Sequence, residues 1–167
     1  MRLGTYAENR DGLNEVFATA ARAVEVAPSK RAAMPKSDLF WVGNLGGGMD
    51  GMLRMQDGHE LEVRGVQVLV ALERFRAERG DYPQTLTELL PSFIDKLPMD
   101  PWSGEPFHYV RVDAKKDRVG RSFLLYSVGA DGVDDGGVEQ AFEIFNSQRS
   151  KPGTDFVVNR WDDVFDP

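Results

Sequence analysis

One helix with a wide apolar arc constrains this chain more than any other feature. Its apolar residues recur at helical spacing: Leu61, Val68, Leu72 and Phe75, widened by Val66, Leu69 and Val70. Charged residues cover the outer face of its second half, and Gly80 provides a C-terminal stop. The pattern predicts a helix over 60–79. An apolar arc this wide needs a broad partner, and the face of a β-sheet is the natural one.

The residues after this helix predict that sheet. Tyr82 and Pro83 form a rigid elbow, and Thr85 with Glu88 has the spacing of a capping box at the start of a short helix. A turn over 97–106 follows. Strands are predicted over 107–112, 122–128 and 154–160 from their alternating or β-branched residues. We therefore expect an α+β fold, with a long helix packed on a three- to four-stranded antiparallel sheet.

The first 58 residues predict a separate N-terminal part. A helix is expected over 11–27, with Asp11 at its start and Pro28 at its end. The segment 29–58 contains the glycine-rich run GNLGGGMDGM, and we interpret it as a mobile linker. Phe40 and Trp41 are expected to pack against the main domain, because large aromatic side chains are rarely left in water. The predicted organisation is an N-terminal helical extension with a linker over 1–58 and an α+β domain over 59–167.

Composition excludes several classes of function. The net charge is −7, which disfavours nucleic acids and anionic membranes as partners. The chain has no cysteine, so disulfides, thiolate metal sites and cysteine nucleophiles are absent. No apolar run is long enough to span a bilayer, and the first residues lack the apolar core of a signal peptide. The two histidines, His59 and His108, are too few for a typical zinc site.

An acidic, glycine-rich loop follows the second predicted strand. Asp131, Asp134 and Asp135 lie within five residues, surrounded by glycines. Three carboxylates this close repel one another unless a cation or solvent separates them, and oxygen ligands suit Ca²⁺. The spacing does not fit an EF-hand, which requires glutamate where this chain has Phe142. The alternative is an acidic turn in solvent that holds no ion.

Several motifs, in a fixed order, resemble one known family. They are ALERFRAERGDYPQTLTELLP, LPMDPWSGEPFHYV and FLLYSVGADGVDDGG. This order of helix, Tyr-Pro elbow, Asp-Pro-Trp turn and Tyr-Ser-x-Gly-Ala-Asp-Gly loop resembles the soluble domain of type IV pilin-like proteins. The major pseudopilins of type II secretion are the nearest group. The resemblance covers about residues 66–137, with weaker agreement at DFVVNRW.

The resemblance implies a helix on an antiparallel sheet and a structural calcium ion in the loop after the second strand. By position, Asp131 matches the first family aspartate, and the carbonyl of Val128 matches a backbone ligand. For the second aspartate the candidates are Asp135 and Asp155, followed by Asp134 and Glu139. The family's membrane helix and processing site are missing from residues 1–60, which places assembly into a filament in question. An extracytoplasmic location would follow from the resemblance.

The function expected is a non-catalytic structural or interaction module, resembling a pseudopilin head. Its partners would be other proteins or further copies of itself. The alternative is a carbohydrate-active or other hydrolytic domain that uses the carboxylates of the acidic loop. A glycosidase needs two carboxylates across a cleft, and the sequence does not mark which two. No Gly-x-Ser-x-Gly nucleophile motif occurs.

Overall fold

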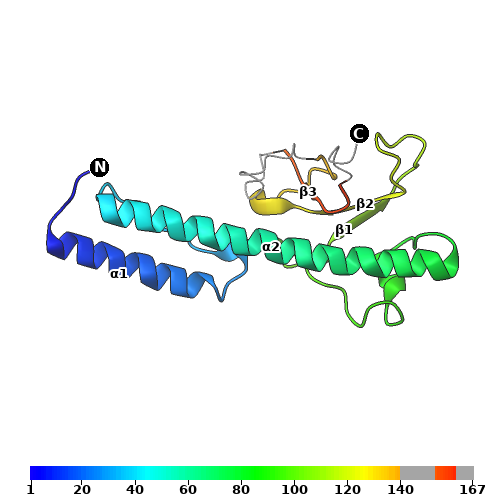
Figure 1. Cartoon of the computed structure of the whole chain (residues 1–167), viewed down its shortest axis with the longest axis horizontal. Coiled ribbons are helices and arrows are strands. Elements are labelled where there is room, and N and C mark those ends of the chain that lie inside the picture. The colour runs from blue at the N-terminus through cyan, green and yellow to red at the C-terminus, as the bar shows by residue number, and fades with distance from the viewer. Residues whose placement is uncertain (140–152, 161–167) are drawn as a thin grey trace, which may run out of the picture. The chain divides into compact units, whose positions relative to one another are not determined.

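The structure is a computed structural model that describes residues 1–139 and 153–160. It contains two compact units, Met1–Gly58 and His59–Pro167, and the boundary between them falls inside one helix. The elements, in chain order, are α1 (Tyr6–Ala23), η1 (Pro28–Lys30), α2 (Phe40–Arg79), η2 (Leu86–Leu89), β1 (His108–Arg111), β2 (Phe123–Ser127), η3 (Gly129–Asp131) and β3 (Phe156–Val157) (Figure 1). Within the described ranges, no helix has a segment long and apolar enough to cross a membrane.

The first unit pairs α1 with the N-terminal half of α2. Val16, Leu39 and Val42 form its small core. The two helices approach closely at Gly12, where a Cβ atom would lie 2.7 Å from Cγ2 of Val42. Glycine at this position therefore sets how near α1 comes to α2.

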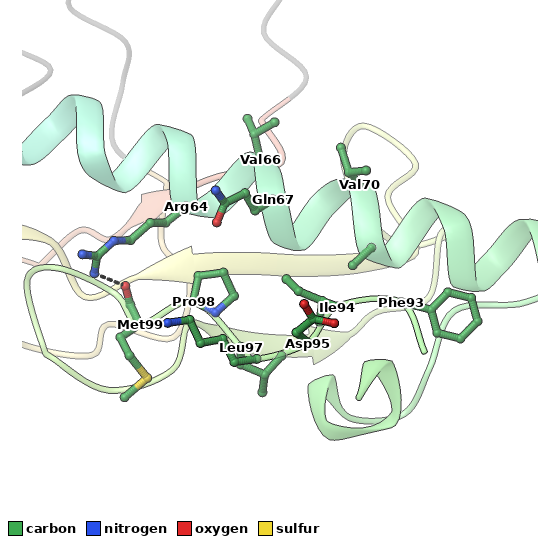
Figure 2. A pocket seen from close by; sticks show the side chains of 12 residues that line it. Arg64, Val66, Gln67, Val70, Phe93, Ile94, Asp95, Leu97, Pro98 and Met99 are labelled. Carbon is green, nitrogen blue, oxygen red and sulfur yellow. Dashed lines mark hydrogen bonds between the residues drawn. The ribbon is translucent and has the colours of Figure 1, made fainter. Parts of the chain in front are cut away.

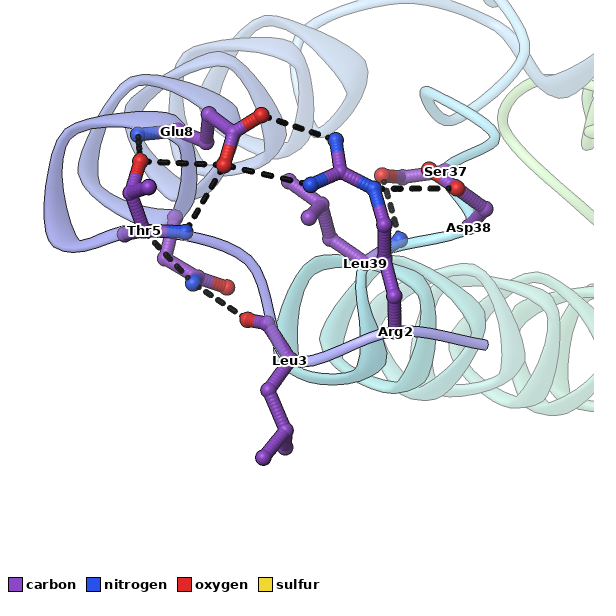
Figure 3. A network of polar contacts seen from close by, with 8 residues as sticks. Arg2, Leu3, Thr5, Glu8, Ser37, Asp38 and Leu39 are labelled. Atoms are coloured by element: carbon purple, nitrogen blue, oxygen red, sulfur yellow. Dashed lines mark hydrogen bonds and ion pairs between the residues drawn. The ribbon is translucent and has the colours of Figure 1, made fainter.

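A polar network fixes the start of α1 (Figure 3). Thr5 and Glu8 form a capping box, so the prediction that Asp11 caps this helix is wrong. Arg2 binds Glu8 at 2.8 Å and Asp38 at 3.2 Å. The hydrogen bond from Arg2, aided by those from Thr5, lowers the pKa of Glu8 to about 2. The helix ends at Ala23 rather than at Pro28, because the chain turns over residues 24–26 before the proline is reached.

The glycine-rich segment is helical rather than a linker over residues 40–58, which corrects the prediction for this part of the chain. Two of its glycines lie against backbone. A Cβ atom at Gly43 would lie 2.7 Å from the carbonyl oxygen of Ser37, and one at Gly46 would lie 3.2 Å from that of Pro35. These glycines thus allow the chain before α2 to pack directly on the helix. Phe40 and Trp41 are 40% and 59% exposed, so the expectation that they are buried is also wrong.

A buried ion pair joins the end of α1 to α2 within the first unit. Asp57 is 2% exposed, and its Oδ2 atom pairs with Nη1 of Arg31, whose side chain is 14% exposed. Nε of Arg31 also donates to the carbonyl oxygens of Ala23 at 2.7 Å and Val26 at 3.0 Å. Ala23 is the last residue of α1, where backbone acceptors lack helical partners, and Val26 lies in the turn that follows. Arg31 therefore caps α1 and ties it to α2.

The second unit packs the C-terminal half of α2 on a small sheet, which confirms the expected α+β class. The described strands form a three-stranded antiparallel sheet in the order β1-β2-β3. In the register of the first pair, His108 faces Tyr126 and Arg111 faces Phe123. The core joins helix residues such as Leu61 and Leu72 to sheet residues such as Leu125. The sheet thus buries one side of the helix, as its apolar arc requires.

The elbow between the helix and the sheet is held by β1. The hydroxyl of Tyr109 donates to the carbonyl of Pro83 at 2.8 Å, and Arg111 donates to the carbonyl of Tyr82. The ring of Tyr82 contacts that of Phe123, with centroids 4.6 Å apart. The predicted capping box at Thr85 is confirmed, although the helix it starts is a single 3₁₀ turn.

Two features of this unit differ from the sequence prediction. Val66 and Val70 are 52% and 54% exposed, so they lie outside the apolar arc that packs on the sheet. The third strand has two residues rather than seven, because the side chain of Asn159 continues the pairing. Its Oδ1 atom accepts from the amide of Leu125 at 2.9 Å, and its Nδ2 atom donates to the carbonyl of Phe123 at 2.7 Å.

Candidate metal centre

The acidic loop leaves the sheet at the end of β2 and passes through the 3₁₀ turn η3. Val128, which is buried, caps this turn, and Gly132 closes it with a φ of 71°. This left-handed conformation favours glycine, so the loop's glycine content here has a steric cause. Residues 140–152 of the predicted loop lie outside the described residues.

Asp155 is the most buried carboxylate among the described residues of this loop. It is 1% exposed, and its amide donates to the carbonyl of Val138 at 2.8 Å. Oδ2 accepts from the amides of Gly137 at 2.7 Å and Asp135 at 3.1 Å. Oδ1 is buried and has no hydrogen-bond partner in the described part of the chain. Burial raises the pKa of Asp155, and the charges of Asp134 and Asp135 raise it further.

Asp135 also has a buried carboxylate oxygen. Its Oδ2 atom is buried and, among the residues the structure describes, has no donor. A buried carboxylate oxygen without a donor is costly, because it has lost water and gained nothing in exchange. Asp135 and Asp155 therefore each present one open oxygen, and their charges interact.

Asp134 lies in the same cluster but its oxygens are occupied. Oδ1 accepts from the amide of Gly136 at 2.9 Å and the hydroxyl of Tyr126 at 3.1 Å. Oδ2 lies 3.3 Å from Nδ1 of His108, whose ring stacks on that of Tyr126. The amide of Gly136 is the main cause of the lowered pKa of Asp134. Sequence reasoning missed His108 and Tyr126, although a hairpin pairing of the two strands places them opposite each other.

The other predicted ligands, Asp131 and Glu139, are less well placed to bind a metal ion. Asp131 is exposed, and its Oδ1 atom accepts from the amide of Val133 at 3.2 Å. Glu139 pairs with Arg121 at 3.6 Å and Arg118 at 3.8 Å. Within residues 1–139 and 153–160, no three acidic or histidine side chains are grouped closely enough to hold a metal ion.

The donor set fits a hard cation in part. As far as the described residues show, Asp135 and Asp155 each have one carboxylate oxygen without a donor. Carboxylate oxygens are preferred ligands of Ca²⁺, which also accepts backbone carbonyls and water. The structure links Asp135 to Asp155 through the amide of Asp135, and the charge of Asp134 acts on Asp155. It gives Asp131 a separate, exposed position and shows no contact between it and these three.

Comparison of the chain with protein-family models, with curated proteins and with solved structures finds no match in any of the three.

Proposed function

We propose that this chain is a non-catalytic structural or interaction module, resembling a pseudopilin head, whose loop after β2 binds Ca²⁺ through Asp135 and Asp155. The observation that supports the ion is that Oδ2 of Asp135 and Oδ1 of Asp155 are both buried and have no hydrogen-bond donor within residues 1–139 and 153–160. A divalent cation between them would replace the water whose loss on burial raises the pKa of Asp155, and it would offset the repulsion from Asp134 and Asp135 that raises this pKa further. The family part of the proposal rests on the elbow, turn and loop motifs.

A hydrolytic role has less support. Two surface grooves of the second unit have volumes of about 680 and 750 Å³. The first is lined by one carboxylate, Asp95, and the second by one, Glu73. Acid–base hydrolysis of a glycoside needs two carboxylates that face each other across the substrate. Neither groove supplies such a pair.

Thermal unfolding tests the ion. We expect Ca²⁺ at one hundred times its Kd to add about 2.7 kcal/mol to the free energy of unfolding. For a chain of this length that is a rise in Tm of roughly 5–10 °C over the value in chelator. Titration calorimetry with CaCl₂ should give one site per chain.

Asp155→Asn is the informative variant. Its side-chain oxygen still accepts from the amides of Gly137 and Asp135, but the buried charge is gone. We expect a higher Tm than wild type in chelator and no response to Ca²⁺. Asp11→Asn, at an exposed carboxylate of α1, should respond to Ca²⁺ as wild type does. A full Ca²⁺ response in Asp155→Asn would contradict the proposed site.

A separate assay tests the non-catalytic assignment. Wild type and Asp135→Asn are incubated with a panel of polysaccharides and reducing ends are measured. We expect no turnover by either protein. Turnover by wild type that is lost in Asp135→Asn would favour the hydrolytic alternative.

A further inference from the structure

A groove with a volume of about 750 Å³ lies on the second unit and is lined by α2, the elbow and the sheet. Its apolar lining includes Leu69 of α2, Phe123 of β2 and Val158, the residue after β3. Tyr82 of the elbow forms one side. Sites for small organic molecules typically enclose about 300–1,000 Å³ and combine an apolar lining with a few polar groups. The volume and lining of this groove therefore suit such a molecule.

The charged residues of this lining are mostly arginines, so we call it the arginine groove. Arg76, Arg121 and Arg160 come from three separate parts of the chain, and Glu73 is the one carboxylate among the described residues beside them. The protein as a whole carries a net charge of −7. The arginine groove is therefore opposite in sign to the average surface, and an anion is the ligand that its charge complements.

The guanidinium of Arg121 has an unfilled hydrogen-bonding position. Its side chain is 8% exposed, and its Nε and Nη2 atoms donate to Asp117 at 3.2 and 3.1 Å. Nη1 is buried and, in the part of the chain that the structure describes, has no hydrogen-bond acceptor. Oε2 of Glu139 is 3.6 Å away, beyond hydrogen-bonding distance. A buried N–H group without an acceptor is costly, and a ligand carboxylate that takes the place of Glu139 there would supply one.

Arg76 provides an accessible positive charge at the same groove. Its side chain is 54% exposed, and its guanidinium lies 5.1 Å from the centroid of the Tyr82 ring. Nη2 pairs with Oε2 of Glu73 at 2.9 Å, while the Tyr82 hydroxyl donates to Oε1 of the same carboxylate at 2.5 Å. Tyr82 and Glu73 thus hold this guanidinium at the groove, where a ligand can reach it.

We propose that the arginine groove binds a small organic carboxylate with an aromatic or aliphatic body. The carboxylate would bind at Arg121, with Arg76 adding charge from the exposed side. The body would cover the apolar lining at Leu69, Phe123 and Val158. This inference goes beyond the proposed function and does not depend on the ion site.

The acidic neighbours of the arginines favour one negative charge on the ligand over two. Glu73 pairs with Arg76, Asp117 pairs with Arg121, and Glu139 also lies near Arg121. A phosphate monoester carries close to two negative charges at neutral pH, so these three carboxylates would repel it more strongly than a carboxylate. The ligand class is therefore a carboxylate rather than a phosphate.

Titration of the full chain with naphthoate, followed through the NMR signals of its backbone amides, tests the proposal. A ligand of this size has a Kd of about 1 mM or lower when it fits its site. We expect the amides of residues 119–123 and 158–160 to shift in a saturable way. Naphthamide has the same body without the charge, and it should bind at least about tenfold more weakly.

Two substitutions should move the affinity for naphthoate in opposite directions. Arg76→Gln removes an exposed charge and should raise the Kd about five- to tenfold, with little effect on naphthamide. Glu139→Gln removes the carboxylate that competes for Nη1 of Arg121 and should lower the Kd about threefold. A variant that only loosened the fold would weaken binding in both cases. Arg121 itself is unsuited to substitution, because Asp117, which is 10% exposed, would lose its partner.

Arg64→Gln is the matched control, because Arg64 borders the other groove of this unit, between α2 and residues 93–99 (Figure 2). It should leave naphthoate binding unchanged. Shifts confined to residues 93–99, or equal affinities for naphthoate and naphthamide, would overturn the proposal. The absence of shifts at about 5 mM naphthoate would overturn it as well.

Discussion

Replacing Asp57 with alanine tests whether the buried ion pair with Arg31 holds the first unit together. Asp57 is 2% exposed and lies on α2, while Arg31 also donates to the carbonyls at and just after the end of α1. The substitution leaves a nearly buried guanidinium without its anion. We therefore expect α1 to lose part of its attachment to α2.

The expected loss can be estimated from the contacts. Removal of one partner of a buried ion pair costs about 3–5 kcal/mol. Arg31 keeps its two carbonyl bonds in Asp57→Ala, so we expect a loss near the lower end, about 3 kcal/mol. Arg31→Ala also removes both carbonyl bonds and should cost about 1 kcal/mol more. In the double variant the losses should overlap by about 2 kcal/mol.

Native-state hydrogen exchange of the α1 amides is the appropriate assay, because it reports on this unit directly. A global unfolding curve of a chain with two compact units need not follow a two-state transition. The matched control is Asp50→Ala. It removes an exposed pair with Arg54 on the same helix, whose side chains are 40% and 38% exposed, and should cost no more than about 0.5 kcal/mol.

Two results would refute this reasoning. Equal losses in Asp57→Ala and Asp50→Ala would mean that burial of the pair does not matter. Strict additivity of the two single substitutions would mean that Arg31 and Asp57 do not stabilise each other. By contrast, Arg31→Met combined with Asp57→Leu should be close to wild type in stability, because it removes both charges together.

Three further predictions concern packing, the sheet and pH. Gly12→Ala should lower the free energy of unfolding by up to about 2 kcal/mol, because the clash with Val42 exceeds the gain in helix propensity. Gly47→Ala, at an exposed position, should raise the free energy of unfolding by about 1 kcal/mol. Equal melting points for the two variants would contradict this prediction. Asn159→Ala should lower the free energy of unfolding by about 2–4 kcal/mol, because it leaves a buried amide and a buried carbonyl of β2 unpaired. Urea unfolding measures this loss. An unchanged midpoint would show that the side chain does not support the sheet. The lowered pKa of Glu8, about 2, means that its ionised form stabilises α1 above its ordinary pKa of 4.5 and that this contribution is lost as pH falls towards 2. The Tm difference between wild type and Glu8→Gln should accordingly be full above pH 4.5 and vanish near pH 2, and a difference that persists there would refute the assignment.

Much of the second unit could be predicted from sequence, because local pattern and tertiary packing agree there. The apolar arc of 60–79, the capping box at Thr85 and the first two strands all appear close to their predicted positions. The prediction of a linker for the glycine-rich segment was wrong. Helix propensity disfavours glycine, but close packing against the backbone before α2 requires glycine there. The prediction that Val66 and Val70 pack on the sheet was wrong, because periodicity cannot separate a residue at the edge of a buried arc from an exposed one beside it.

The candidate metal centre was predicted as a loop but not as a set of contacts. Carboxylate density pointed to Asp131, Asp134 and Asp135, and the family resemblance placed Asp131 first and added Asp155 beside Asp135 as a candidate. The fold adds the hydrogen bond between the amide of Asp135 and Asp155, twenty residues later in the chain, and the burial of Asp155. The involvement of His108 depends on the strand register, which a hairpin length alone does not fix.

The glycine content of α2 has a consequence for the order in which the helix forms. Residues 60–79 contain one glycine, whereas Gly43, Gly46, Gly47, Gly48 and Gly51 each cost about 1 kcal/mol relative to alanine. The N-terminal half of α2 should therefore be coil until α1 and the preceding chain dock against it. One continuous helix in the native state would then belong to two cooperative folding units, and the half that begins at Phe40 would open first.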